Sequence, residues 1–393
     1  MEYVFSDRIA ALKPSAIREI LKATSDPHVI PFAAGNPAPE AFPVDAVRTI
    51  TRDILTENPI GALQYGISEG YTPLRDAVRS RMRDKFGCGR DFDDVIIVSG
   101  AQQGAELTCK VLCNEGDTVL CENPSFIGVL NALRSYNVNL KGIPMQDDGL
   151  DVDYLEKVLE TDTRVKLLYI IPNFQNPTGI TLSLAKRRAV YDLCRRHGVV
   201  ILEDNPYGDL RFAGKDLPTI KSMDDEGVVV YNGSFSKILA PGLRVGFVLA
   251  PKALLQKIIV AKQVSDVHTS MLSQMVAERF MTRFDLEAHI KRLQGIYRDK
   301  CARMIRGMEQ HFDPRVRFTR PEGGLFLWCT LPHGADMLGY CKRAAQAGVA
   351  IVPGVAFNTS PDDSSDSFRL NYSTPRDEQI ERGIEILGTI PID

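Results

Sequence analysis

The feature that most constrains the fold is a series of short, unbroken apolar runs in the middle of the chain. Strands buried on both faces read as continuous apolar runs, whereas strands with one wet face alternate. Amphipathic segments separate several of the runs, such as residues 184–197, which Gly198 ends as a plausible helix cap. This alternation predicts an α/β fold in which helices cover a mostly parallel sheet. The runs are Val95–Val98, Thr118–Cys121, Leu167–Ile171, Val199–Leu202, Val228–Tyr231 and Val245–Ala250.

The end of the chain has a different pattern. Residues 285–312 carry one apolar stripe at helical spacing and predict a single long helix. The shorter apolar segments 324–328, 349–352 and 367–372 follow it. Together they predict a smaller α+β unit beside the main sheet.

The first forty residues predict a short helix at 15–23 and then a loop at 32–37. We expect this segment to join the smaller unit or the active site rather than the central sheet. The expected organisation is therefore a large domain of residues 44–281 and a small domain that combines residues 1–43 with residues 282–393.

Composition excludes several classes of protein. The 393 residues are 44% hydrophobic and carry a net charge of −3, which gives no indication of a nucleic-acid partner. The sequence contains no apolar stretch of about 18 residues, so we expect no membrane span. The eight cysteines form no CxxC and the histidines no HExxH, so we expect reduced thiols in the cytoplasm and no metal site. No GxGxxG follows a strand, which disfavours a dehydrogenase.

Polar residues follow the predicted strands, and ligands of open parallel sheets bind beyond the carboxyl ends of the strands. Small residues at 99–104 open a helix after one run, and such a turn suits a phosphate. Asn-Pro-Thr-Gly at 176–179 follows another run, and Asp204 and Tyr207 follow a third. Each of these features alone is also compatible with an ordinary turn or cap.

A lysine and an arginine follow the run Val228–Tyr231. Ser234, Ser236, Lys237 and Arg244 gather within eleven positions, in a segment where a bare ammonium is costly. The loops together supply a phosphate cradle, a carboxylate, a phenol and a lysine. These groups match pyridoxal 5′-phosphate (PLP), whose phosphate, ring nitrogen and aldehyde require donors, a carboxylate and an amine.

Four motifs carry a resemblance to the fold-type I, class I/II PLP-dependent aminotransferases, over nearly the whole chain. Within that family the chain looks most like the branch of 2-aminoadipate and kynurenine aminotransferases. The resemblance implies a seven-stranded, mostly parallel sheet between helices plus a smaller α+β domain. The motifs are Asn176–Gly179, Asp204–Tyr207, Gly233–Lys237 with Arg244, and Phe368–Tyr372.

The resemblance implies catalytic roles for three residues. Lys237 holds the cofactor covalently and afterwards moves the proton at the substrate Cα. Asp204 pairs with the ring nitrogen. Tyr207, together with Asn176, hydrogen-bonds the phenolic oxygen of the cofactor.

The cofactor phosphate is expected to bind side chains and backbone N–H groups. The resemblance assigns it Ser234, Ser236 and Arg244, with the N–H groups of Ala101 and Gln102. The family often has a hydroxyl at position 101, where this chain offers only backbone.

The remaining assignments concern the ring face, the substrate and the neighbouring subunit. Phe126 stacks on the cofactor ring, where many relatives carry tyrosine. Arg369 clamps the substrate α-carboxylate, assisted by the backbone of Gly35. Arg18 meets a distal acidic group of the substrate or is a surface charge. Tyr65 reaches the phosphate of a second subunit or is a packed tyrosine, and the first reading implies a homodimer with shared active sites.

The expected reaction is transfer of an amino group from an L-amino acid to a 2-oxo acid such as 2-oxoglutarate. Donors of the 2-aminoadipate, aromatic or branched-chain type all fit the resemblance. One alternative keeps the fold and cofactor but catalyses β-elimination, racemisation or decarboxylation. Another is a PLP-binding regulatory domain, which predicts a basic helix-turn-helix extension.

Overall fold

The computed structural model describes residues 3–10, 12, 28–360 and 362–392. Its central feature is an eight-stranded sheet in the order β1-β8-β7-β6-β5-β2-β3-β4. Strands β7, β6, β5, β2 and β3 run parallel, whereas β8 is antiparallel to both of its neighbours. The strands are β1 (Asp93–Val98), β2 (Thr118–Asn123), β3 (Asn139–Gln146), β4 (Gly149–Leu150), β5 (Val165–Ile170), β6 (Val200–Asp204), β7 (Val229–Ser234) and β8 (Gly246–Pro251).

All six apolar runs are strands, and the predicted α/β class is confirmed. The seven-stranded expectation corresponds to β1, β2, β3 and β5–β8, and the two-residue β4 adds a short hairpin at the edge. The helix predicted at 184–197 is α9, and Gly198 caps it at φ 66°, donating to the carbonyls of Arg195 and Cys194. That left-handed conformation is one that glycine adopts without strain.

Successive side chains of the parallel strands enter two different cores. On one face, Leu168, Ile170 and Ile201 pack with apolar residues of α8 and α9. On the other face, Leu167, Tyr169 and Leu202 join a larger core that includes α6. Because both faces are covered, the strands need apolar residues at every position, which explains the continuous runs.

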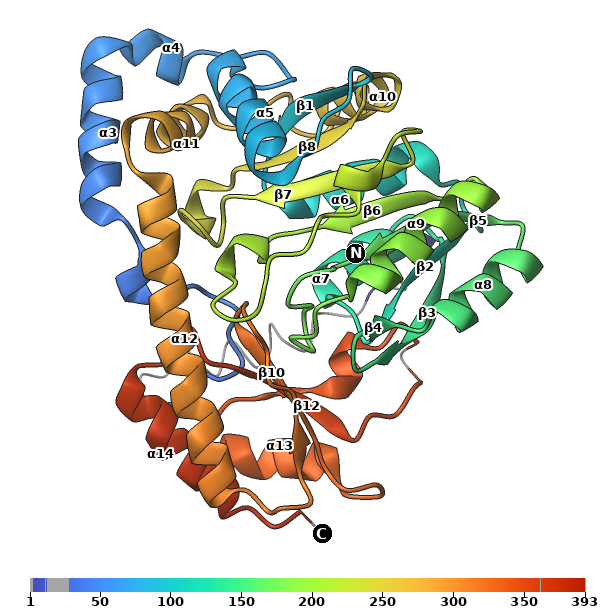
Figure 1. Ribbon diagram of the computed structural model, residues 1–393, viewed down its shortest axis with the longest axis vertical. Helices are drawn as coiled ribbons and strands as arrows, with labels where there is room; N and C mark the ends of the chain where they lie inside the picture. Colours follow the sequence, from blue (N-terminus) through green and yellow to red (C-terminus); the bar gives the residue numbers. More distant parts are fainter. Residues whose placement is uncertain (1–2, 11, 13–27, 361, 393) are drawn as a thin grey trace.

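The helices surround the sheet and extend from it (Figure 1). Among the described residues, no helix is long and apolar enough to cross a membrane. The helices are α1 (Asp7–Ala10), α3 (Val44–Glu57), α4 (Pro59–Leu63), α5 (Thr72–Phe86), α6 (Ala101–Leu112), α7 (Ile127–Arg134), α8 (Val152–Thr161), α9 (Leu184–His197), α10 (Lys252–Gln263), α11 (Met271–Arg283), α12 (Leu286–His311), α13 (Met337–Gln346) and α14 (Asp377–Gly388).

The second unit is built on a four-stranded antiparallel sheet in the order β11-β12-β10-β9. Helix α12 is the long helix predicted at 285–312, and the side chain of Asp285 caps its first turn by accepting from the Ala288 N–H. It runs from the level of the large sheet down to the small one (Figure 1). The helix predicted at 15–23 lies outside the described residues. The strands are β9 (Arg317–Phe318), β10 (Phe326–Thr330), β11 (Val352–Pro353) and β12 (Ser367–Asn371).

A buried charge cluster fixes one edge of the large sheet. The Lys221 ammonium lies 2.8 Å from Asp93, 2.9 Å from Asp224 and 2.9 Å from the Val229 carbonyl, and none of the three side chains is more than 1% exposed. One buried ammonium thus compensates the charges of two buried carboxylates.

Lys221→Met should therefore destabilise the protein strongly. We expect a loss of about 3–5 kcal/mol, since it leaves two buried carboxylates uncompensated. Urea unfolding of the cofactor-free protein measures it. Arg195→Met is the matched control, because the Arg195–Glu226 pair is exposed and surface pairs are worth about 0–1 kcal/mol. Equal losses in the two variants would contradict the structural role of Lys221.

Candidate active site

A cavity of about 380 Å³ lies where β5, β6 and β7 end and α6 begins. It meets the expectation that ligands bind beyond the carboxyl ends of parallel strands. Arg369 reaches it from β12 of the smaller sheet. Twelve of the residues singled out in the sequence line it, namely Gly35, Ala101, Gln102, Phe126, Asn176, Asp204, Tyr207, Ser234, Ser236, Lys237, Arg244 and Arg369.

Two of the predicted site residues are not among the lining. Tyr65 is 80% exposed and lies outside the cavity, with its ring edge-on to His268 at 5.7 Å. Arg18 lies outside the described residues.

Asp204 ends β6 as a buried carboxylate. It accepts hydrogen bonds from the Tyr169 hydroxyl at 2.9 Å and from the Asn232 amide at 3.1 Å. Burial raises the pKa of Asp204 to about 7, and these two hydrogen bonds oppose the rise. Asp204 makes no ion pair with any residue that the structure describes, so a cation at the cavity would stabilise its charged form.

Lys237 is the amine of the cavity. Its Nζ donates to the Gly35 carbonyl at 2.8 Å. Burial lowers the pKa of Lys237 to about 8, and the positive charges of Arg369 and Arg244 contribute to that fall. A substantial fraction of the side chain is therefore a neutral amine, and hence a nucleophile, at pH values near 8.

Arg369 is a buried guanidinium. It donates to Asn176 Oδ1 and to the Ala33 carbonyl, both at 2.8 Å, and its Nε is buried without a partner. It lies over the rings of Phe326 at 4.3 Å and Phe357 at 4.9 Å. Burial lowers the pKa of Arg369 to about 10. With no carboxylate beside it among the described residues, this fork is suited to an anionic ligand.

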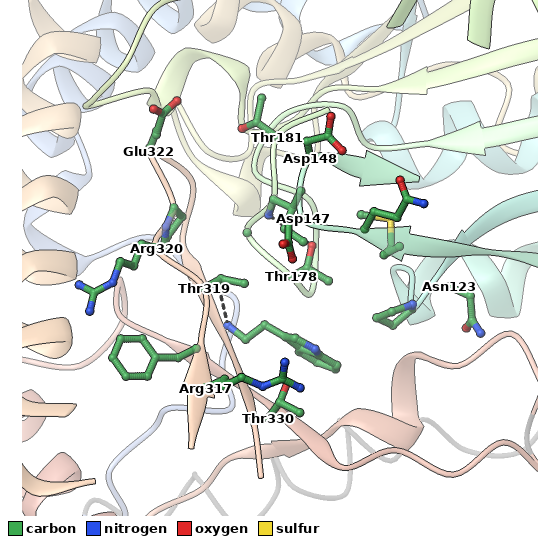
Figure 2. Close-up of a pocket in the computed structure, with 18 of the residues that line it drawn as sticks. Asn123, Asp147, Asp148, Thr178, Thr181, Arg317, Thr319, Arg320, Glu322 and Thr330 are labelled. Carbon is green, nitrogen blue, oxygen red and sulfur yellow. Dashed lines mark hydrogen bonds between the residues drawn. The ribbon is translucent and has the colours of Figure 1, made fainter. Parts of the chain in front are cut away.

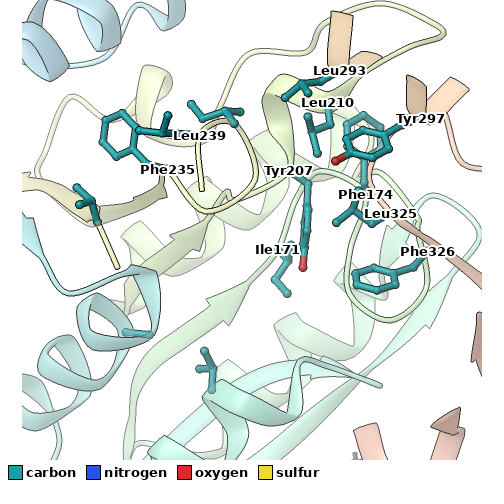
Figure 3. Packing of buried hydrophobic residues seen from close by; sticks show 14 of the residues in the cluster. Ile171, Phe174, Tyr207, Leu210, Phe235, Leu239, Leu293, Tyr297, Leu325 and Phe326 are labelled. Atoms are coloured by element: carbon teal, nitrogen blue, oxygen red, sulfur yellow. The ribbon is translucent and has the colours of Figure 1, made fainter. Parts of the chain in front are cut away.

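Asn176 is held by the loop that follows β5. Gln175 Oε1 accepts from Thr178 N–H at 3.0 Å, and Gln175 Nε2 donates to the Pro124 carbonyl at 2.8 Å. The amide of Asn176 then lies 3.5 Å from the Tyr207 hydroxyl. Figure 3 shows Tyr207 between Ile171 and Phe326, and its ring meets that of Phe326 edge-on at 5.8 Å.

The amino end of α6 faces the same cavity. Gly100 precedes the helix at φ 82°, and a Cβ there would lie 2.4 Å from the Arg244 guanidinium. The backbone angle is one that glycine adopts without strain, so glycine suits this position. The free N–H groups of a helix start and this guanidinium make a binding site for an anion.

A second, wider cleft of about 1000 Å³ lies between residues 145–148 and 178–181 on one side and residues 316–322 on the other. Asp147 and Thr178 lie on one side of it and Arg317 on the other, whereas the Arg320 side chain points away and pairs with Glu309 (Figure 2). None of the predicted site residues line this cleft. Twelve of the predicted site residues line the smaller cavity instead.

The family profile named aminotransferase class I and II matches residues 27–387. The chain belongs to this family. An aromatic-amino-acid aminotransferase of Thermococcus litoralis is 38% identical over 391 residues, which cover 98% of this chain and 94% of that protein. The predicted family and the transaminase reaction are confirmed.

Two crystal structures support the same fold and cofactor. The kynurenine aminotransferase of Pyrococcus horikoshii, in complex with PMP, has a TM-score of 0.94 and 36% identity, covering 98% of this chain and 96% of that one. The α-aminoadipate aminotransferase of Thermus thermophilus, complexed with N-(5′-phosphopyridoxyl)-L-leucine, has a TM-score of 0.89, 36% identity and the same coverage. This aminotransferase is a fold-type I enzyme whose cofactor is pyridoxal phosphate.

The cavity fits that cofactor on its own chemistry. Among the described residues, the Asp204 carboxylate pairs with no cation, and the Lys237 amine has a pKa of about 8. The start of α6 can bind an anion, and the Arg369 guanidinium has an Nε without a partner. Sequence reasoning missed Tyr169, Asn232 and Phe326. Tyr169 places a hydroxyl within an apolar strand, and Asn232 directly follows a predicted strand. Both positions could have been recognised from the sequence as polar groups near the site.

The depressed pKa of Lys237 gives a prediction for the cofactor-free protein. Competitive acetylation, analysed peptide by peptide, should label Lys237 half-maximally near pH 8, because the neutral amine is the reactive form. Arg369→Met should raise that midpoint by removing a nearby positive charge, whereas Arg298→Met on the surface should leave it unchanged. A midpoint at the ordinary lysine value of about 10.4 would contradict the burial argument.

Proposed function

We propose that this transaminase uses L-amino acids of the 2-aminoadipate, aromatic or branched-chain type as donors and 2-oxoglutarate as acceptor. The observation that carries the proposal is the buried guanidinium of Arg369, which has a free Nε and lines the same cavity as the amine of Lys237. Every α-amino acid brings a carboxylate for such a fork. The names of the relatives and the apolar wall formed by Phe126, Val129, Ile171 and Phe326 support the range of donors.

When bound, PLP supplies an electron-accepting ring that stabilises the negative charge left at the substrate Cα after deprotonation. In our proposal, Asp204 keeps the ring nitrogen protonated, since its carboxylate lacks a cation of its own. Tyr207 and Asn176 donate to the phenolic oxygen of the cofactor, and Phe126 packs on its ring.

The Lys237 amine has two successive tasks in this proposal. It would hold the cofactor covalently before substrate arrives, and once displaced it would move the proton between the substrate Cα and the cofactor C4′. A pKa of about 8 suits a group that must accept and release a proton near neutral pH.

The remaining lining groups hold substrate and phosphate. Arg369 orients the α-carboxylate. The Gly35 carbonyl accepts a hydrogen bond from Lys237, and this contact keeps the Gly35 loop close to the substrate. Arg18 stays a candidate for reading a distal carboxylate. The phosphate is assigned to Ser234, Ser236, Arg244 and the backbone N–H groups of Ala101 and Gln102.

We also propose a cytoplasmic homodimer with a division into residues 44–281 and residues 1–43 with 282–393. The start of α12 at Leu286, from which the chain passes to the second sheet, supports the domain boundary. All eight cysteines are free, and six of them are buried, which suits a reducing compartment. Exposed apolar side chains on residues 60–67 and 264–267 support the dimer, and they are Ile60, Leu63, Tyr65, Ile67, Val264 and Val267.

A donor panel tests the function. With 2-oxoglutarate as acceptor, glutamate should form from 2-aminoadipate, aromatic or branched-chain donors. Arg369→Lys should raise KM for every donor by about 10-fold to 100-fold without changing their order, because it weakens the contact that all donors share. Lys237→Ala serves as the background control. A KM change confined to one donor would mean that Arg369 reads the side chain instead of the α-carboxylate.

Shared active sites predict complementation between inactive variants. In our proposal Tyr65 serves the partner's site, so a heterodimer of Tyr65→Ala and Lys237→Ala contains one intact site. At limiting cofactor, the mixed and reassociated variants should regain about a quarter of wild-type activity, since half of randomly formed dimers are mixed. If Tyr65 acted within its own subunit, mixing would restore nothing.

A further inference from the structure

Lys262 and Asp266 form an ion pair beside the turn that opens α6, in which the lysine side chain is buried and that of Asp266 is 28% exposed. The Lys262 side chain is fully buried at the end of α10, and its Nζ lies 2.8 and 3.0 Å from the two carboxylate oxygens of Asp266. The same ammonium donates to Gln103 Oε1 at 2.8 Å and to Thr269 Oγ1 at 3.1 Å. The lysine is therefore fully committed to holding these neighbours together.

Asp266 connects the pair to the turn. Its Oδ2 accepts from the Ser99 hydroxyl at 2.6 Å and from the Gln103 amide at 2.8 Å. Gln103 in turn accepts from the Ser99 N–H at 2.8 Å, and the Ser99 carbonyl accepts from Arg244 at 3.3 Å. Both ends of Ser99 and the side chain of Arg244 are thus fixed by one charged network.

The other side of the pair holds the loop 264–269. Val267 lies there at φ 65°, a left-handed conformation that a β-branched residue adopts only under constraint from its surroundings. His268 accepts from the Gly66 N–H at 3.3 Å, so its ring proton is on Nδ1, 2.8 Å from the Thr269 carbonyl. The edge of the Tyr65 ring packs against this imidazole.

We infer that Lys262 and Asp266 are positioning residues for the cofactor phosphate. They fix the turn from Ser99 to Ala101 in their own subunit and, through His268, the loop that presents Tyr65. Neither residue lines the cavity, so they act through the groups that they hold. The inference rests on the proposed role of this turn in binding phosphate.

Asp266→Asn tests the inference through cofactor affinity. The cofactor-free variant is titrated with PLP and, separately, with pyridoxal, which has the same ring and aldehyde but no phosphate. We expect the dissociation constant for PLP to rise about 10-fold to 100-fold, because a charge-assisted network is lost, and that for pyridoxal to stay unchanged. An unchanged PLP affinity, or equal losses for both ligands, would overturn the inference.

Two further variants keep the test decisive. Ser99→Ala removes one hydroxyl from the network and carries the test if Asp266→Asn does not fold, with an expected PLP-selective loss of about 5-fold. Asp313→Asn is the matched control, because it removes a carboxylate from the exposed pair with Arg315, and it should change neither affinity. If the wild-type protein itself bound PLP no more tightly than pyridoxal, the proposed phosphate site would fail, independently of the role of Asp266.

Discussion

The architecture depends on holding three ionisable groups at one cavity without an opposite charge for any of them. Asp204, Lys237 and Arg369 make no ion pair with described residues, although burial shifts the pKa of each toward its neutral form. Charges held in this way cost stability, because water no longer solvates them. In our proposal, a protonated cofactor ring and a substrate carboxylate supply the opposite charges for Asp204 and Arg369, so that ligand binding offsets part of this cost.

The two sheets must meet closely for these charges to share one cavity. Asp204 ends β6 of the large sheet, whereas Arg369 lies within β12 of the small one. The loop after β5 bridges them, and a Cβ at Gly179 would come within 2.8 Å of the Phe326 carbonyl. The distance between Asn176 and Arg369 is thus fixed by backbone packing, and a rigid scaffold of this kind holds reacting groups in register.

The sequence predicts those elements in which burial requires apolar residues. It does not predict elements that lack this requirement. The six continuous runs are strands because both faces of the sheet are covered. Strand β3 was not recognised, since Asn139–Gln146 pairs near the sheet edge and contains glycine and proline. Most of the cavity residues were found because they follow strand ends in motifs, whereas Gly35 and Arg369 were assigned from the family resemblance. Phe326 and Asn232 were missed because their contacts cross between elements far apart in the chain.

The division of the cavity into charged groups and an apolar wall limits how finely the site can discriminate between donors. In our proposal, Asp204 and Arg244 contact the cofactor, and Arg369 contacts the α-carboxylate that every L-amino acid possesses, so these charged groups treat different donors alike. Besides Arg18, the groups that we propose discriminate between donors are those of the apolar wall that includes Val129 and Phe326. One methylene in such a wall is worth only about 1–3 kcal/mol. This limit supports our proposal of a broad set of donors, as do relatives whose names span aromatic amino acids, 2-aminoadipate and kynurenine.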